Sequence, residues 1–251
     1  MVDNQLWKNI NRLLEMYNDG LLGGESMPED ALSDVVSKEE LPNILTLGMA
    51  LNYQRNSYAL WKSVTEAYKD EDTRWIFSPT TVVNCNIDTL REALLKHRVG
   101  LQPNSHPDIW YKVAKGIQNS SANGDILDFI ESAGYDVANM KNIIQIQRKR
   151  EFPYLSGPKI FNYWLYVMEG YTNISWKSRE LITIAPDTHI LQSSVKLGLC
   201  SENVLNASAK DREFVADKWN KALLDTNLAP IDVHTPLWLW SRAGFPSLEY
   251  P

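Results

Sequence analysis

The segment Glu151-Phe-Pro-Tyr-Leu-Ser-Gly-Pro-Lys-Ile-Phe-Asn-Tyr-Trp-Leu165 contains a tight turn at Gly157 and then the start of a predicted helix. Another predicted helix precedes it. The first helix ends near Gln147. The second begins at Pro158, which suits the first helical position because an N–H there would have no helical acceptor. Backbone N–H groups at such a turn and at a helix N-terminus can hold a phosphate group. The segment therefore predicts a hairpin between two helices that binds an anion.

Lys159 is the residue of this segment that can carry chemistry, since it lies in the first turn of the predicted helix. A cation at that position opposes the positive end of the helix dipole. The same field, together with partial burial, favours the neutral amine of a lysine, and a neutral amine is a nucleophile. From the residues alone a second interpretation stays open, in which Lys159 is a surface lysine that happens to begin a helix.

Another helix start lies in the segment Thr183-Ile-Ala-Pro-Asp-Thr-His-Ile-Leu191. Asp187 follows a proline and precedes a helical run, and aspartate is a preferred N-cap. We expect Asp187 to cap this helix, a role that does not exclude a second one for its carboxylate.

The rest of the chain has helical periodicity almost throughout. An apolar stripe runs from Leu6 to Tyr17, and the one alternating pattern, Thr80–Val83, is too short to build a sheet. The sequence therefore predicts an all-α fold of two lobes, with further helices at about 44–69, 87–97, 107–118, 125–133, 136–147, 158–168, 187–197, 202–225 and 234–242.

The composition excludes a disordered chain, because 44% of the 251 residues are apolar and 22% are charged. The apolar runs are far shorter than the roughly 20 residues that span a bilayer, and the first residues lack the pattern of a signal peptide. We therefore expect an intracellular protein without a membrane partner, located in the cytoplasm or nucleoid if it is prokaryotic. Two cysteines cannot form a disulfide framework or a four-cysteine metal cluster.

The net charge is −6, yet one part of the chain is basic. Between Lys141 and Lys159, five lysines and arginines stand against one glutamate, which gives 5 − 1 = +4. A confined basic patch suits a protein that contacts a few phosphates at one place. Such runs are more often solvated helix ends, so this interpretation also stays open.

Several motifs together resemble the helix-hairpin-helix DNA glycosylase superfamily. Gly157-Pro-Lys159 is similar to the lysine end of its hairpin, and Pro186-Asp-Thr-His189 resembles a segment of the endonuclease III relatives. The archaeal 8-oxoguanine DNA glycosylases are the most similar branch, through Ala50-Leu-Asn-Tyr-Gln-Arg55, Trp61 and Leu228-Ala-Pro-Ile-Asp-Val-His-Thr-Pro-Leu-Trp-Leu-Trp-Ser-Arg242. The resemblance covers about residues 48–69 and 141–243 and leaves residues 1–45 unassigned.

The resemblance implies a helix-hairpin-helix motif and an active site in a cleft between two helical lobes. One lobe comprises residues 58–175, with the hairpin at about 141–170, and the other comprises residues 1–57 and 176–251. By this resemblance, Lys159 is expected to attack C1′ of a nucleotide flipped out of DNA, to expel the damaged base and to form a Schiff base, after which elimination of the 3′ phosphate nicks the strand. Asp187 matches the acid that stabilises positive charge on the sugar.

The resemblance also implies a base pocket. Tyr163 and Trp238 match the two rings that stack on the base, and Trp61 matches a pocket tryptophan. His234 stands where the archaeal family has a pocket aspartate, and Asp232 lies two residues earlier, so recognition of 8-oxoguanine itself stays open. The residues expected to grip the DNA backbone are Arg148, Lys149, Arg150, Ser156, Gly157 and His189.

The expected partner is single- or double-stranded DNA with a damaged base, bound by a monomer. No group of His, Cys, Asp and Glu has metal-ligand spacing, so we expect no catalytic metal and no iron–sulfur cluster. The resemblance allows a monovalent cation at the hairpin carbonyls. The alternatives are a monofunctional glycosylase or a nucleoside glycosidase, a DNA-binding hairpin protein without chemistry, and a helical scaffold whose tryptophans are all core.

Overall fold

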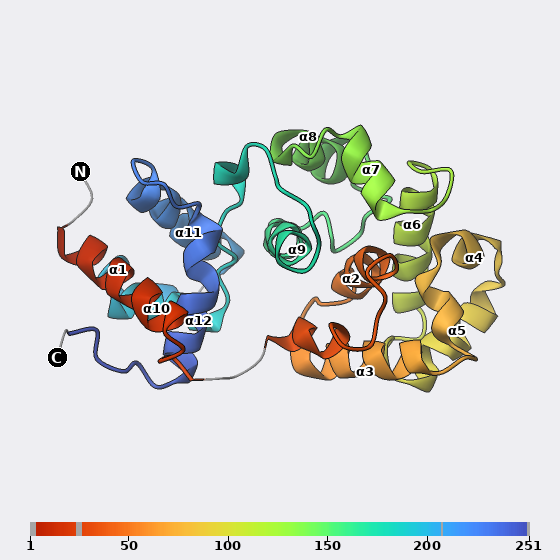
Figure 1. Ribbon diagram of the computed structural model, residues 1–251, viewed down its shortest axis with the longest axis horizontal. Helices are drawn as coiled ribbons and strands as arrows, with labels where there is room; N and C mark the ends of the chain where they lie inside the picture. Colours follow the sequence, from red (N-terminus) through yellow and green to blue (C-terminus); the bar gives the residue numbers. More distant parts are fainter. Residues whose placement is uncertain (1–3, 24–26, 207, 250–251) are drawn as a thin grey trace. The chain divides into compact units, whose positions relative to one another are not determined.

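The structure, a computed structural model, describes residues 4–23, 27–206 and 208–249. These residues form α-helices, short 3-10 helices labelled η, and one π-helix (Figure 1). Within them, β pairing is limited to an isolated bridge between Asp136 and Lys177. The predicted all-α fold class is confirmed. None of the described helices is both long and apolar enough to pass through a bilayer.

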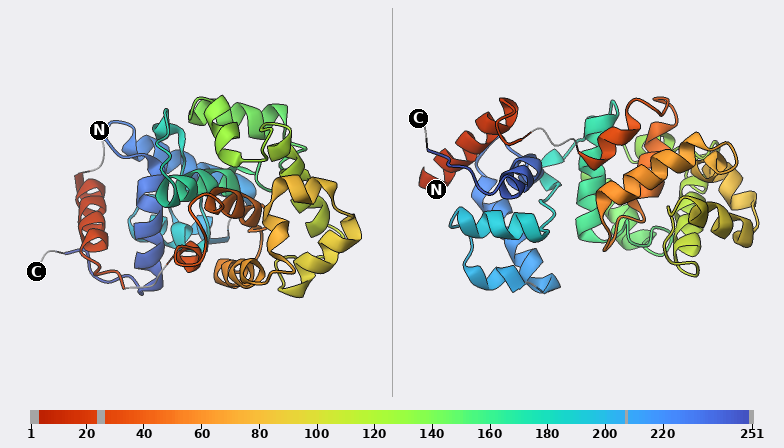
Figure 2. Two further views of the ribbon diagram at one scale, coloured as in Figure 1. Left: turned by 45° about the vertical axis from the view of Figure 1, so that its right-hand side comes forward. Right: turned by 90° about the horizontal axis from the view of Figure 1, so that it is seen from below.

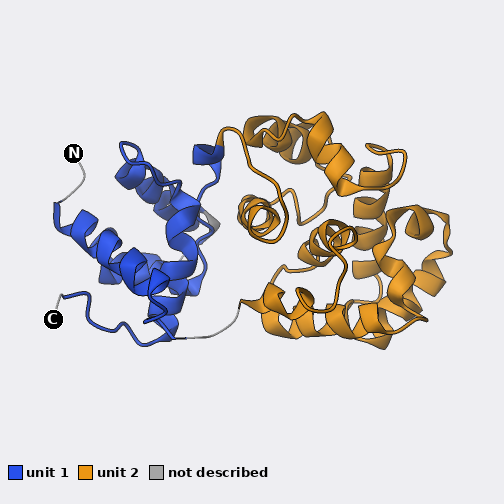
Figure 3. Cartoon of the chain, in the orientation of Figure 1, with its two compact units in different colours: residues 1–25, 179–251 blue, residues 26–178 orange. Residues whose placement is uncertain are grey.

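The chain divides into two compact units (Figure 3). Unit 1 contains residues 1–25 and 179–251, and unit 2 contains residues 26–178. The segment 26–57, which the sequence-based division groups with the chain ends, belongs to unit 2. The reason is packing, because the helix Leu41–Met49 contacts several helices of unit 2 and buries eight of its nine residues.

Unit 2 is organised around α2 (Leu41–Met49) and α9 (Pro158–Tyr171), which pack against each other and lie side by side in Figure 1. The unit also contains η1 (Pro28–Leu32), which lies against α3 (Ser57–Lys69) (Figures 1 and 2). Its remaining elements are η2 (Arg74–Phe77), α4 (Pro79–Asn84), α5 (Ile87–Lys96), α6 (His106–Gln118), α7 (Ile126–Ser132), α8 (Val137–Lys141) and the π-helix η3 (Asn142–Gln147).

Two small residues allow α2 to be buried on several sides. The hydroxyl of Thr46 donates to the carbonyl of Pro42 at 2.8 Å and accepts from the indole N–H of Trp164 on α9 at 3.0 Å. Gly48 lies against Trp61 of α3, so closely that a Cβ added to this glycine would come within 2.7 Å of the indole ring. These contacts place α3 and α9 on the same central helix, and both carry residues of the predicted site.

Unit 1 is a bundle in which α10 and α12 pack against each other. Its core includes Trp219 of α11, whose indole N–H donates to the hydroxyl of Ser194 on α10 at 2.9 Å. The elements are α1 (Asn4–Asn18), η4 (Arg179–Leu181), α10 (Thr188–Lys196), η5 (Glu202–Asn206), α11 (Ala209–Leu223), η6 (Pro230–Val233) and α12 (His234–Arg242).

Two predicted helices are each divided in the structure. The block 44–69 becomes α2 and α3, because the chain turns at Gln54, which has a φ of +52°, and Asn56 then caps α3 by accepting the N–H of Ala59. The block 202–225 becomes η5 and α11, and Ser208 caps α11. Polar side chains that satisfy helix N–H groups thus interrupt the apolar periodicity.

The short alternating pattern Thr80–Val83 lies within α4. Ser78 caps this helix by accepting the N–H of Thr81, and Pro79 occupies the first helical position. The two signals favour a helix start more strongly than four residues can favour a strand.

We predict that Gly48→Ala lowers the free energy of unfolding by about 1–3 kcal/mol, because the new methyl group overlaps the Trp61 ring in a packed interior. Urea denaturation followed by circular dichroism measures the change. Gly170→Ala in α9 is the matched control, since a Cβ there meets no atom within 4 Å. It should leave stability unchanged or raise it by up to about 1 kcal/mol. Equal losses in both variants would contradict the close contact.

Candidate active site

The predicted hairpin is a loop between η3 and α9. Its amide groups donate within the loop, from Gly157 to the carbonyl of Tyr154 at 2.9 Å and from Ser156 to the carbonyl of Phe152 at 2.8 Å. The side chain of Gln145 ties the end of η3 to the Ser156 carbonyl at 3.1 Å. The loop is therefore ordered by its own hydrogen bonds, so the amides left for an anion are those at the start of α9 rather than those of the turn.

Lys159 lies in the first turn of α9, as the sequence predicts, and it is exposed rather than partly buried. Tyr163 follows one helical turn later and shares its face. The opposite face is buried through Phe161, Trp164 and Leu165. Helix α9 is thus fixed by its apolar face and presents Lys159 and Tyr163 on the other.

Arg148 has a structural role that the sequence does not reveal. Its guanidinium group donates to Glu151, to the carbonyl of Gly116 at 2.7 Å and to the hydroxyl of Ser120. It also lies 5.4 Å from the ring of Phe152. Hydrogen bonding from Arg148 is the main cause that lowers the pKa of Glu151. Of the three basic residues expected to contact DNA, the two that remain exposed are Lys149 and Arg150.

Glu29 is the site residue that sequence reasoning missed. It lies in η1 with an exposed fraction of 0%, and the hydroxyl of Tyr163 donates to its Oε2 at 3.2 Å. The indole N–H of Trp61, which is fully buried in α3, faces the same carboxyl group. We call Glu29, Trp61 and Tyr163 the Glu29 cluster. The cluster contains two predicted pocket residues, Trp61 and Tyr163, and an acid from residues 1–45, to which the resemblance assigns no role.

Burial raises the pKa of Glu29 from 4.5 to about 7. Its own backbone, Tyr163 and Trp61 lower the pKa through hydrogen bonding, and the nearby Asp30 raises it by charge repulsion. Among the described residues, neither Glu29 Oε1 nor Trp61 Nε1 has a hydrogen-bond partner of normal geometry. Burial outweighs the hydrogen bonds, so the neutral acid is the favoured form below pH 7.

The other carboxyl group of η1 faces α9 as well. The hydroxyl of Tyr171 donates to Asp30 at 2.5 Å. Burial, followed by the negative charges of η1, raises the pKa values of Tyr163 and Tyr171. Within the described parts of the chain, no lysine, arginine or histidine pairs with Glu29 or Asp30. The Glu29 and Asp30 carboxyl groups therefore accept hydrogen bonds from phenols and pair with no cation of the described chain.

In unit 1, Asp187 caps α10 as predicted. Its Oδ1 accepts the N–H of Ile190 at 3.0 Å, and the preceding Pro186 carbonyl accepts from Arg212 at 2.6 Å. The side chain is half-buried, and Oδ2 accepts no hydrogen bond from a residue that the structure describes. The helix start thus holds the carboxylate by one oxygen.

His189 and Trp238 lie together in unit 1, with ring centroids 5.6 Å apart in an edge-on arrangement. The His189 ring also hydrogen-bonds the hydroxyl of Ser241 at 3.0 Å. The guanidinium group of Arg242 lies 4.6 Å from the centre of the Trp238 ring. His189, a predicted contact to the DNA backbone, therefore lies beside Trp238, a predicted stacking ring.

Asp232 and His234, the two candidates for the pocket acid position, differ in their surroundings. Asp232 accepts two hydrogen bonds from Arg179, at 2.9 and 2.6 Å, and caps η6 through the N–H of Ala229 at 2.8 Å. His234 is buried at the start of α12. Both carboxylate oxygens of Asp232 are thus engaged in the fold, and the His234 side chain is enclosed by its surroundings.

The predicted residues belong to different units. Lys159, Tyr163, Trp61 and the hairpin lie in unit 2, and the remaining predicted residues, Asp187, His189, Asp232, His234 and Trp238, lie in unit 1.

A groove of about 660 Å³ opens on unit 2 beside the N-terminal half of α3. Arg55 is held in it by the carbonyls of Val99 at 2.7 Å and Arg98 at 3.2 Å. Partial burial and then the charge of Arg98 lower the pKa of Arg55. In the described chain, Arg55, Lys62 and Arg98 pair with no carboxylate, whereas the other basic residues of the groove, Lys96 and His97, both pair with Asp70.

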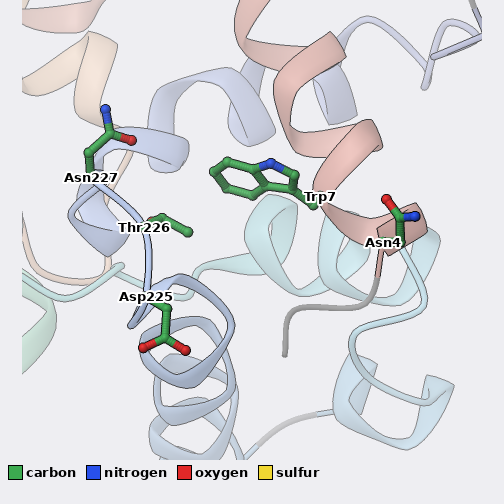
Figure 4. Close-up of a pocket in the computed structure, with 5 residues that line it drawn as sticks. All are labelled: Asn4, Trp7, Asp225, Thr226 and Asn227. Carbon is green, nitrogen blue, oxygen red and sulfur yellow. The ribbon is translucent and has the colours of Figure 1, made fainter.

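A second groove, of about 440 Å³, lies in unit 1. Figure 4 shows the indole of Trp7 among amide, hydroxyl and carboxylate side chains. The groove holds none of the residues that the sequence predicts for the site, and its lining is formed by Asn4, Trp7, Asp225, Thr226 and Asn227.

Among the described residues, no three His, Cys, Asp or Glu side chains are arranged to hold a metal ion. Cys85 and Cys200 are free thiols whose pKa values are raised by partial burial.

The chain matches no known family model, no curated protein and no solved structure. A functional assignment therefore depends on the residues described above and on the resemblance of the short motifs.

We predict that Glu29→Gln stabilises the protein increasingly as pH rises from 4 to 8. Between 4.5 and 7 the unfolded chain releases the Glu29 proton while the folded chain keeps it, so the wild type loses stability and the glutamine variant does not. The difference of 7 − 4.5 = 2.5 pH units corresponds to about 3 kcal/mol.

Urea unfolding at several pH values measures this difference. Glu92→Gln, an exposed position on α5 of the same unit, is the control and should give a curve parallel to that of the wild type. A Glu29→Gln curve that also runs parallel to the wild type would show that Glu29 titrates as an ordinary acid.

Proposed function

We propose that this protein is a base-excision repair DNA glycosylase with AP lyase activity, which removes an oxidised purine, 8-oxoguanine first among them. The observation that carries the proposal is the presentation of Lys159 at the start of α9, directly after the hairpin and one turn before Tyr163. Burial of the opposite face of α9 holds the lysine on a rigid element, which positions a nucleophile better than a loop would.

The chemistry assigned to Lys159 follows the motif resemblance. Its amine attacks C1′, the bond from C1′ to the base breaks, and the base leaves with a proton. Opening of the sugar ring gives an imine between the lysine nitrogen and C1′. Loss of a C2′ proton then expels the 3′ phosphate, which cuts the strand. Reaching a base in a duplex requires flipping the nucleotide out of the stack, at a cost of a few kcal/mol.

Asp187 is assigned the electrostatic role. A half-buried carboxylate stabilises positive charge on the sugar more effectively than a fully hydrated one, because water screens it less. Capping by Oδ1 fixes the group, and Oδ2 is the oxygen that we assign to the sugar.

The proposed base pocket uses aromatic rings. Tyr163 and Trp238 are assigned to stacking on the base, and such stacking contributes about 1–3 kcal/mol per base. By resemblance, Trp61 and His234 are assigned to its polar edge, and both side chains are buried in the structure. A monovalent cation at the hairpin carbonyls remains part of the proposal by resemblance alone.

The proposed DNA contacts are cationic side chains that the fold leaves available. Lys149 and Arg150 are exposed near the hairpin, and the α3 groove adds Arg55, Lys62 and Arg98 without a carboxylate partner in the described chain. Phosphate contacts of this kind position the protein on DNA without reading sequence.

We predict that borohydride traps the wild type covalently on duplexes that carry 8-oxoguanine or an abasic site, and that Lys159→Gln gives no trapped complex. Gel electrophoresis of labelled duplexes measures trapping and nicking together, and a uracil duplex tests substrate preference. Lys149→Gln is the control, since it removes a neighbouring cation without removing the proposed nucleophile. Base release without trapping would favour a monofunctional glycosylase, and no release from any duplex would reject the proposal.

We also predict that Lys62→Gln combined with Arg98→Gln weakens duplex binding and makes it less salt-dependent. Removing one cation that neutralises a phosphate reduces the slope of log affinity against log salt by about 1, so the double variant reduces it by about 2. Fluorescence anisotropy at several salt concentrations gives the slope. Lys112→Gln on α6, whose cation pairs with Asp108 at 2.6 Å, should leave the slope unchanged. An unaltered slope in the double variant would exclude the α3 groove as a DNA-binding surface.

A further inference from the structure

We propose that Glu29 is a positioning residue whose proton controls the placement of Tyr163, and with it the binding of the base. The consequence for base excision rests on the proposed function, whereas the control of Tyr163 does not. The proposal concerns unit 2 alone, because Glu29, Trp61 and Tyr163 all belong to it.

The geometry couples Tyr163 directly to η1. The Tyr163 hydroxyl donates to Glu29 Oε2 at 3.2 Å, and this is the hydrogen bond by which α9 holds the Glu29 side chain. On its other side, η1 lies along α3, where the hydroxyl of Thr65 donates to the carbonyl of Ala31 at 3.4 Å (Figures 1 and 2). Any movement of the Glu29 carboxyl group therefore changes the support of the Tyr163 ring.

Burial makes the ionised form of Glu29 unfavourable, and the described groups that face it include no cation that would offset this effect. Its own element contributes Asp30, α9 contributes Tyr163, with Tyr166 and Tyr171 behind it, and α3 contributes the uncharged indole of Trp61. No cation of the described chain pairs with this group. A buried carboxylate without a cation is strongly disfavoured and is stabilised by reaching water.

The proton on Glu29 thus decides between two arrangements. As the neutral acid, the side chain stays between α3 and α9 and accepts from Tyr163. As the carboxylate, it gains by leaving the apolar surroundings, because the loss of hydration outweighs the hydrogen bond that Tyr163 donates. With a pKa of about 7, the exchange falls in the range where cells operate.

The first experiment observes this exchange without any substrate. Protein labelled with ¹³C at glutamate carboxyl and tyrosine ring carbons is titrated by NMR from pH 5 to pH 9. Signals are assigned by their loss in Glu29→Gln and Tyr163→Phe. We expect the Glu29 signal to titrate near pH 7 and the Tyr163 ring signal to shift with the same midpoint. In Glu29→Gln, the Tyr163 signal should not change with pH.

Two results of this titration overturn the proposal. One is a Glu29 signal that titrates below pH 5. The other is a Tyr163 ring signal whose chemical shift does not change at the midpoint of the Glu29 titration. Glu92→Gln is the matched control and should remove one carboxyl signal while leaving the Tyr163 shift intact. If Glu29→Gln does not fold, the coincidence of the two midpoints in the wild type still decides the question.

The second experiment compares two reactions of one enzyme. Release of a base requires the stacking ring, whereas nicking at a pre-formed abasic site has no base to stack. From pH 6 to pH 8 the neutral fraction of an acid with a pKa of about 7 falls about tenfold, so kcat/KM for base release should fall about tenfold more than kcat/KM for nicking. Glu29→Gln should remove this difference.

The outcomes separate the two proposals. Base release and nicking with identical pH profiles in the wild type would reject control by Glu29 and leave the glycosylase assignment standing. Absence of both reactions at every pH would reject the glycosylase assignment, while a shared NMR midpoint would still support control of Tyr163 by Glu29.

Discussion

The contact between Gly48 and the indole of Trp61 is the constraint on which unit 2 depends. It lets α3 approach α2 closely, and the Thr46–Trp164 hydrogen bond fixes α9 on the same helix. Without these contacts, the ring of Trp61 and the exposed face of α9 would have no fixed relation. A side chain larger than hydrogen at position 48 would separate the elements that support the Glu29 cluster.

Helix α9 combines apolar residues that stabilise its packing with a lysine that does not. Its buried face supplies apolar area, and its other face carries a lysine at the positive end of the helix dipole. Such a placement lowers helix stability slightly and is tolerated because packing of the opposite face determines whether the helix forms. Glu29 is a similar case in unit 2, since a buried acid without a cation opposes folding at neutral pH. Both departures from the rules of stability involve α9, which carries Lys159 and whose Tyr163 binds Glu29, and such departures are expected where residues are kept for function.

The sequence predicted the helix starts at Pro158 and Asp187 and the place of Lys159 in the first turn of its helix, because capping and proline placement are local effects. It did not predict Glu29, since a glutamate in Pro28-Glu-Asp-Ala-Leu32 has the composition of a loop, and its burial depends on helices distant in sequence. The contacts of Arg148 were not predicted for the same reason, as its partners Gly116 and Ser120 lie about thirty residues earlier. The turn between α2 and α3 and the engagement of Asp232 by Arg179 likewise require tertiary contacts.

Unit 2 is formed by one continuous stretch of chain, whereas unit 1 is assembled from the two stretches that flank it. During synthesis from the N-terminus, the residues of unit 2 are complete before α10, α11 and α12 exist. The apolar stripe of α1 therefore cannot pack into its core at once, because its core partners Trp219 and Leu237 are synthesised more than two hundred residues later. Unit 2 can fold as it leaves the ribosome, and unit 1 folds last. The order in which the units form thus follows from the order in which their residues are synthesised.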